Sequence, residues 1–163
     1  MKILVATEKS FAKKAVDGIR QIVEGAGYEL ALLEKYTDKS ELLSAVADVD
    51  ALIIRSDKVT AEVIEAARNL KIVVRAGAGY DNVDLAAATA RGIVVMNTPG
   101  QNSNAVAELA LAMMIFMARN GFTPGTGSEI QGKTLGIHAY GNVGRLVGRK
   151  GKAMGMNVIA YDP

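Results

Sequence analysis

Apolar residues along the first hundred positions follow two repeating patterns. Short continuous runs such as Ile3-Leu4-Val5-Ala6 are typical of strands buried on both faces. Each run is followed by apolar residues at three- and four-residue spacing, which indicates a helix. This alternation predicts an α/β fold with a parallel sheet, flavodoxin-like in its order of elements, over residues 1–100. The predicted strands are 3–6, 30–33, 51–54, 71–74 and 92–96, and the predicted helices are 11–25, 40–47, 60–70 and 85–90.

The pattern changes after residue 100. Residues 104–119, bounded by Asn104 and Arg119, are apolar almost all round apart from Glu108, which predicts a helix buried between domains or between subunits. We therefore expect residues 101–127 to join two domains and the chain to form a homo-oligomer through this helix. The apolar run is too short to span a bilayer, so no membrane partner is expected.

A second strand–helix–strand pattern fills residues 128–163 and contains a glycine turn. Gly141 and Gly144 stand between an apolar strand and a helix, where free N–H groups and the helix dipole favour a phosphate. Asp162 follows the next strand, roughly 20 residues later, where an acid can bind an adenosine ribose. Together these features predict the first βαβ unit of a Rossmann domain that binds NAD rather than NADP.

Two features limit this interpretation of the turn. The usual G-x-G-x-x-G would begin at Ala139, and alanine is tolerable there only if the position does not need a positive φ. A chance glycine-rich turn is the remaining alternative. A nucleoside-triphosphate loop is excluded because Asn142 and Val143 stand where that motif needs lysine and serine or threonine.

Composition excludes several classes of function. Half of the residues are hydrophobic, 22% are charged and the net charge is +2, which is typical of a globular protein and gives no reason to expect a nucleic-acid partner. The chain has no cysteine, so disulfides, thiol catalysis and cysteine-bound zinc are excluded, and we expect a cytoplasmic location. No metal site is predicted.

Ligands of such sheets bind beyond the carboxyl ends of the strands, where two arginines stand. Arg55 follows the third predicted strand, and Arg75 follows the fourth, just before a loop that contains Gly77 and Ala78. Arginines and loop N–H groups suit a small acid with two anionic ends, although each arginine could instead pair with a surface carboxylate. A phosphoacceptor receiver domain is excluded because Thr7 and Arg55 occupy the positions of its acids.

The single histidine, His138, lies on an apolar strand beside the glycine turn. No acid or nucleophile is near it in the sequence, so we expect it to be packed and non-catalytic.

Three longer motifs carry a resemblance to a known family. They are Arg75-Ala-Gly-Ala-Gly-Tyr-Asp-Asn-Val-Asp-Leu, Asn97-Thr-Pro-Gly-Gln-Asn-Ser, and Gly132-Lys-Thr-Leu-Gly-Ile with the later Gly-Asn-Val-Gly-Arg. Over essentially the whole chain the sequence resembles the D-3-phosphoglycerate dehydrogenase group of the NAD-dependent D-2-hydroxyacid dehydrogenases. The resemblance implies oxidation of 3-phosphoglycerate to 3-phosphohydroxypyruvate with NAD, in serine biosynthesis.

The resemblance also implies roles for individual residues. Arg55 and Arg75 would hold the substrate phosphate, the backbone near Gly77 and Ala78 its carboxylate, and Asn102 would border the cleft. Ala78 would also approach the nicotinamide. The remaining cofactor contacts would come from Tyr140, Gly141, Asn142 and Val143 around the pyrophosphate and from Asp162 on the ribose.

The sequence departs from the family at Pro163, where members continue into the part that carries their catalytic arginine, glutamate and histidine or lysine. We therefore assign no catalytic residue and expect the chain to be inactive alone. The alternative is a non-enzymatic binding or regulatory module that pairs with other subunits. The preferred 2-hydroxy acid stays open, since two arginines also suit a dicarboxylate.

Overall fold

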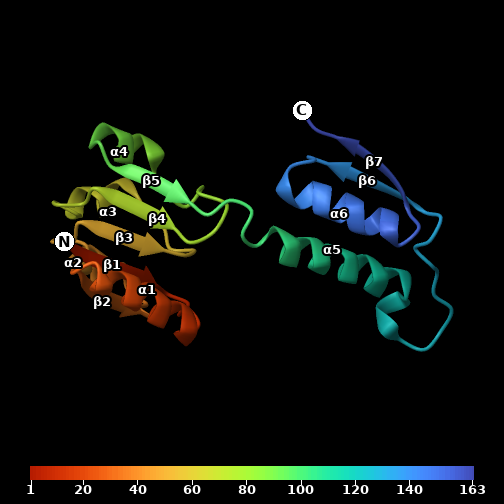
Figure 1. The fold of residues 1–163 in the computed structure, drawn as a ribbon, viewed down its shortest axis with the longest axis horizontal. Coiled ribbons are helices and arrows are strands. Elements are labelled where there is room, and N and C mark those ends of the chain that lie inside the picture. Colours follow the sequence, from red (N-terminus) through yellow and green to blue (C-terminus); the bar gives the residue numbers. More distant parts are fainter. The chain divides into compact units, whose positions relative to one another are not determined.

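The computed structural model describes residues 1–163, which form two compact units, Met1–Pro99 and Gly100–Pro163. The first unit alternates strands and helices throughout, and each helix returns the chain to the amino end of the next strand (Figure 1). Its elements are β1 (Lys2–Thr7), α1 (Lys13–Gly25), β2 (Glu29–Glu34), α2 (Lys39–Ala45), β3 (Ala51–Ile54), α3 (Ala61–Ala66), β4 (Ile72–Arg75), α4 (Leu85–Ala90) and β5 (Val94–Asn97).

The five strands form one parallel sheet in the order β2-β1-β3-β4-β5. This is the flavodoxin-like order, so the predicted α/β fold class is confirmed. The sheet places the carboxyl ends of all five strands along one edge, and in the register Ile54 of β3 pairs with Arg75 of β4.

The core of the first unit lies between the sheet and α2, α3 and α4. Leu4, Leu52 and Val73 from three neighbouring strands pack in one buried cluster with residues of these helices, including Val63 and Ile64 of α3. Helix α3 is shorter than the predicted 60–70, because the backbone leaves the helical conformation at Ala67 (ψ 79°), which is itself buried in the core.

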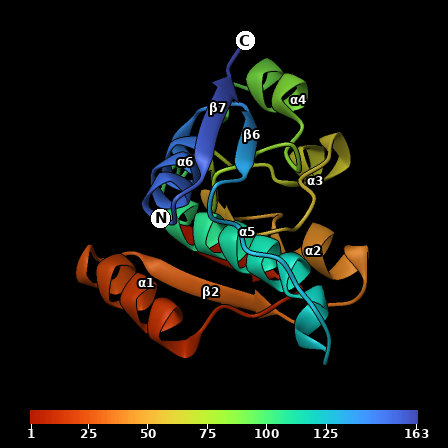
Figure 2. The ribbon, with the colours of Figure 1, turned by 90° about the vertical axis from the view of Figure 1, so that its right-hand side faces the viewer.

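The second unit contains α5 (Ser103–Ala118), a 3₁₀ turn η1 (Asn120–Phe122), β6 (Thr134–His138), α6 (Asn142–Ala153) and β7 (Asn157–Tyr161). Strands β6 and β7 pair in parallel, as Figure 2 shows, and α5 packs against α6. No helix of the structure has both the length and the apolar character needed to cross a membrane.

Helix α6 approaches β6 closely because glycines line the side that faces the strand. A Cβ on Gly151 would lie 2.9 Å from the Leu135 side chain, and one on Gly144 would lie 2.2 Å from the Ala139 carbonyl oxygen. The opposite face of the two strands is open, with Ile159 and Tyr161 each 63% exposed.

Candidate functional site

The two arginines singled out in the sequence begin neighbouring loops at the carboxyl edge of the first sheet. Arg55 directly follows Ile54, and the Ala76 N–H after Arg75 donates to the Ile54 carbonyl at 2.8 Å. Arg55 is exposed and Arg75 is half-buried. Neither belongs to any of the ion pairs of the structure, which all join other residues, so the alternative that each arginine pairs with a surface carboxylate is wrong.

Arg75 has a further unusual feature. Its Nε is buried and has no hydrogen-bond partner, which is rare for a buried donor. The guanidinium folds back over Gly77, where a Cβ would lie 1.4 Å from Nη1. Glycine is therefore required at position 77 for this arginine conformation, and not for a positive φ.

The loop after β4 supplies backbone donors, although not all that the sequence indicated. The Gly77 N–H already donates to the Arg75 carbonyl at 2.8 Å. The N–H groups of Ala78 and Gly79 have no partner, so they are the ones available to an anion. Asn97 at the end of β5 fixes the loop, because its Nδ2 donates to the Ala78 carbonyl at 2.7 Å.

Sequence reasoning missed Asp57, which is only 3% exposed at this edge. Its carboxylate accepts the Tyr36 hydroxyl and the Glu8 N–H, both at 2.7 Å, and the Arg55 N–H at 3.2 Å. Burial, followed by the bond to Asp57, raises the pKa of Tyr36 well above its usual range, so this hydroxyl stays a donor. The sequence around Asp57, Arg-Ser-Asp-Lys, is polar and is typical of a surface loop. Nothing in it indicates that Asp57 is buried beside Tyr36, which is distant in sequence.

Sequence reasoning also missed Asn82, which joins the loops after β3 and β4. Its Nδ2 donates to the Asp57 carbonyl at 2.7 Å. The two loops are therefore joined by a partly buried side-chain hydrogen bond and not only by the sheet.

In the second unit, the turn between β6 and α6 presents the N-terminus of a twelve-residue helix. Gly141 is the N-cap and no side chain caps the helix, so the N–H groups of Asn142, Val143 and Gly144 have no partner. A Cβ on Gly141 would meet nothing within 4 Å, which leaves open space in front of these donors. The arrangement fits a phosphate group.

The condition under which alanine would be tolerated at position 139, that the position needs no positive φ, is not met. The φ of Ala139 is +75°, so the position does need the left-handed conformation that glycine adopts freely, and alanine occupies it at a cost. The backbone is held there because the Ala139 N–H donates to the Tyr161 carbonyl at 2.8 Å.

Tyr140 presents its backbone rather than its ring to the turn. The ring lies along α6, where a Cβ on Gly148 would be 2.8 Å from the Tyr140 hydroxyl oxygen. The Tyr140 carbonyl accepts from Arg145 Nε at 3.0 Å, which braces the turn. Asp162 directly follows β7 and is exposed.

The other two singled-out residues of this unit are exposed. Asn102 precedes α5, and its side chain makes no capping hydrogen bond. His138 was expected to be packed, which is wrong: it is exposed and only stacks on Tyr161, with ring centroids 5.6 Å apart. It faces the open side of the two strands because side chains alternate along β6.

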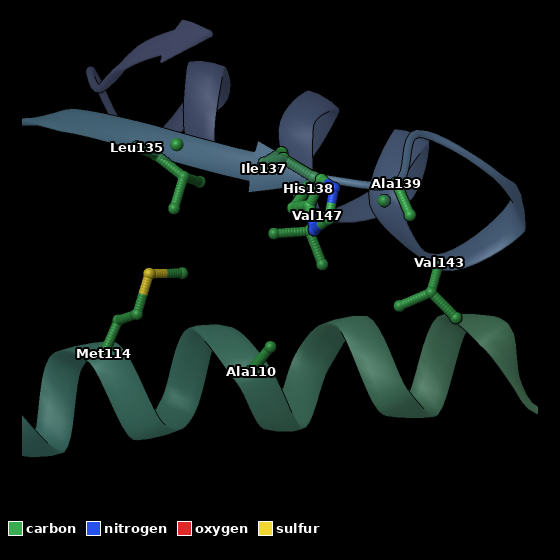
Figure 3. Close-up of a pocket in the computed structure, with 10 residues that line it drawn as sticks. Ala110, Met114, Leu135, Ile137, His138, Ala139, Val143 and Val147 are labelled. Atoms are coloured by element: carbon green, nitrogen blue, oxygen red, sulfur yellow. The ribbon is translucent and has the colours of Figure 1, made fainter. Parts of the chain in front are cut away.

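A cavity of about 410 Å³ adjoins the turn (Figure 3). Ala110 and Met114 of α5, Val143 and Val147 of α6, and Leu135 of β6 contribute apolar walls. Such a lining suits an apolar group and not a phosphate. Nowhere in the structure do three or more histidine, aspartate or glutamate side chains gather as metal ligands would.

Comparison with known proteins gives a consistent result. The model of the family described as D-isomer specific 2-hydroxyacid dehydrogenase, catalytic domain, matches residues 4–157. A hydroxypyruvate reductase from Thermotoga maritima is 43% identical, with 83% of this chain and 49% of the relative covered. A D-3-phosphoglycerate dehydrogenase from Archaeoglobus fulgidus is 42% identical, with 100% of this chain and 32% of the relative covered.

Among solved structures, the 3-phosphoglycerate dehydrogenase of Entamoeba histolytica with bound NAD⁺ is similar with a TM-score of 0.96 and 52% identity. The match covers 100% of this chain and 54% of that one. The chain therefore spans about half, or less, of the length of the proteins that it matches.

Proposed function

The chain belongs to the D-isomer specific 2-hydroxyacid dehydrogenase family, and we propose on that premise that it is part of a D-3-phosphoglycerate dehydrogenase. In this proposal residues 1–100 form the substrate domain, residues 101–127 join the domains, and residues 128–163 form the first βαβ unit of the NAD-binding domain. The reaction is the oxidation of 3-phosphoglycerate to 3-phosphohydroxypyruvate in serine biosynthesis. Cysteine is absent, which suits a reducing compartment, and we propose a cytoplasmic location.

The observation that carries the substrate proposal is the pair of arginines without carboxylate partners at the carboxyl edge of the first sheet. A buried guanidinium N–H with no acceptor, such as Arg75 Nε, is costly unless a ligand supplies one. Guanidinium groups match phosphate oxygens with two parallel hydrogen bonds. A hydroxypyruvate reductase and phosphoglycerate dehydrogenases are both among the relatives, and two free arginines favour the phosphorylated acid.

The carboxylate end of the substrate is assigned to the loop after β4. The N–H groups of Ala78 and Gly79 are free to donate to it, while the backbone of Gly77 shapes the loop under Arg75. On the resemblance to the family alone, we also propose Asn102 as a substrate contact and Ala78 as a neighbour of the bound nicotinamide.

NAD fits the second unit because the turn before α6 offers unpaired N–H groups and open space. Tyr140 and Gly141 would line the pyrophosphate with their backbone, Asn142 and Val143 would donate to it, and the exposed Asp162 would accept from the ribose hydroxyls. When bound, the nicotinamide supplies the hydride acceptor of the reaction. The chain's own part is to orient the two anionic ends of the substrate.

The 163-residue chain alone is expected to be inactive. The first unit contains no histidine, and His138 in the second unit stacks on Tyr161 instead of meeting a partner acid. Without a positioned acid or base, proton transfer loses roughly two to four powers of ten in rate.

One observation favours a second candidate function, a module that pairs with other subunits. Helix α5 exposes Leu109 (61%), Met113 (59%) and Met117 (74%), which recur at every fourth residue and form an apolar stripe along one side of the helix. We propose that residues 104–119 form a homo-oligomer contact. Light scattering of the pure chain tests it: Leu109→Lys with Met113→Lys should give a smaller particle than the wild type.

The substrate proposal is tested by calorimetric titration of the chain with 3-phosphoglycerate. Arg75→Ala should weaken binding about 10- to 100-fold, since a hydrogen bond to a charged group contributes about 1.5–3 kcal/mol. Arg68→Ala is the matched control, because it removes the same charge before β4, at the other end of the sheet. Equal losses in both variants, or no binding by the wild type, would refute the proposal.

A further inference from the structure

The two loops that carry the proposed substrate contacts are joined by one amide side chain. Asn82 Nδ2 donates to the backbone carbonyl oxygen of Asp57 at 2.7 Å and lies 3.5 Å from the backbone carbonyl oxygen of Arg55. The backbone carbonyl of Asn82 accepts the Val59 N–H at 2.9 Å, and Val59 forms an isolated parallel bridge with Val83. Both valines are buried, so the junction has an apolar base. The loop after β3 therefore cannot shift relative to the loop after β4 without breaking this junction.

The Asp57 carboxylate holds the other side of the Arg55 loop. It accepts the Arg55 N–H and reaches back to the loops after β1 and β2 through Glu8 and Tyr36. No cationic side chain pairs with it. A buried carboxylate whose oxygens are occupied by three donors is already satisfied, so it organises the backbone rather than binding a ligand.

We propose that Asp57 and Asn82 are positioning residues that set the separation between Arg55 and the free N–H groups of Ala78 and Gly79. This inference rests on the proposed function, in which Arg55 holds the phosphate and the loop N–H groups hold the carboxylate. A ligand with two anionic ends gains affinity from the second end only if the two contacts are correctly spaced. The pair thereby selects acids that carry both a phosphate and a carboxylate over single anions.

The test compares two ligands, 3-phosphoglycerate and inorganic phosphate, by calorimetry. In Asn82→Ala and in Asp57→Asn the affinity for 3-phosphoglycerate should fall about tenfold or more, since small displacements of paired contacts cost about that much. The affinity for inorganic phosphate, which uses one end only, should change less than about twofold by the same reasoning. A residue that only stabilises the fold would not change the ratio of the two affinities.

Asp50→Asn is the matched control. Asp50 makes the same kind of contact at the amino end of the sheet, where its carboxylate accepts the Lys2 N–H at 2.9 Å and Lys71 Nζ at 2.8 Å. This variant should leave the ratio unchanged. Tyr36→Phe removes one donor from Asp57 and should shift the ratio in the same direction by a smaller factor, which keeps the test decisive if Asp57→Asn does not fold.

Several outcomes overturn the inference. In the first, the wild type binds 3-phosphoglycerate, but the ratio of the affinities for 3-phosphoglycerate and inorganic phosphate is unchanged in Asn82→Ala and Asp57→Asn. In the second, Asp57→Asn binds both ligands more tightly than the wild type, which would mean that Asp57 acts only as a repulsive charge. If the wild type does not bind 3-phosphoglycerate, the proposed function fails, and ligand-free NMR then decides the positioning role. The Arg55, Ala78 and Gly79 amide resonances must move in Asn82→Ala and stay in place in Asp50→Asn.

Discussion

Replacing Ala139 with glycine should stabilise the second unit, contrary to the usual effect of glycine. A left-handed φ such as the +75° of Ala139 costs an L-residue about 1–2 kcal/mol, and glycine removes that cost. Glycine also loses more backbone entropy on folding, about 0.4–1 kcal/mol. The alanine methyl group is exposed at the edge of the cavity, so its loss removes little packing.

The two effects leave a net gain of about 0.5–1 kcal/mol in the free energy of unfolding. For a unit of this size that gain raises the melting temperature by about 2–8 °C. Amide hydrogen exchange of β6 and β7, whose slowest protons report on unfolding of this unit, measures the change separately from the first unit.

Ala160→Gly is the matched control. Ala160 is also exposed, but it lies in β7 with an ordinary strand backbone, so the same substitution should destabilise by about 0.5–1 kcal/mol. If Ala139→Gly accelerates exchange as much as Ala160→Gly does, the argument from backbone strain is refuted.

Three further predictions follow from the packing and the charges. Gly144→Ala should destabilise the second unit by about 1–3 kcal/mol in urea unfolding, because the new Cβ meets the Ala139 carbonyl oxygen; an unchanged midpoint would contradict the close packing of α6 on β6. Leu52→Ala, at a fully buried position of β3, should lower the free energy of unfolding of the first unit by about 2–5 kcal/mol. A smaller loss would mean that the core relaxes to fill the cavity left by the leucine side chain. The chain should also lose stability in acid: the Ser40 backbone N–H lowers the pKa of Asp38, and the Lys71 side chain lowers that of Asp50, so their contributions are complete above the unfolded value of about 3.9 and disappear as the pH falls through the lower native values. Urea midpoints between pH 6 and 2.5 measure this loss, which should be shallower in Asp50→Asn.

The strands and the fold class could be predicted because their signal is local. Buried parallel strands such as β3 are continuous apolar runs, and the spacing of apolar residues in the following helix shows which side it buries. The positions of Arg55 and Arg75 at one edge followed from the topology alone. The end of α3 could not be predicted in this way, because burial of Ala67 in the core overrides the helical preference of its neighbours.

The polar network formed by Asp57 and Asn82 could not be predicted from the sequence, for a different reason. Asp57 accepts a hydrogen bond from Tyr36, 21 residues earlier, and Asn82 donates to the Asp57 carbonyl, 25 residues away, so neither position carries a local signal. The glycine motif identified Ala139 as a position where a positive φ would matter, but the φ itself could not be predicted, because it depends on the hydrogen bond to Tyr161 in the neighbouring strand.

The distribution of charge partners gives independent support to an anionic substrate. At the amino end of the first sheet, the lysines are neutralised, since Lys2 pairs with Asp48 at 2.9 Å and Lys71 with Asp50 at 2.8 Å. At the carboxyl end, Arg55 and Arg75 have no carboxylate partner, and the one buried acid there, Asp57, is occupied by uncharged donors. If the arginines only served solubility, the buried Nε of Arg75 would remain an uncompensated cost to the folded state. An anion held at this edge removes that cost, and it places the binding energy at the end of the sheet where ligands of parallel folds are bound.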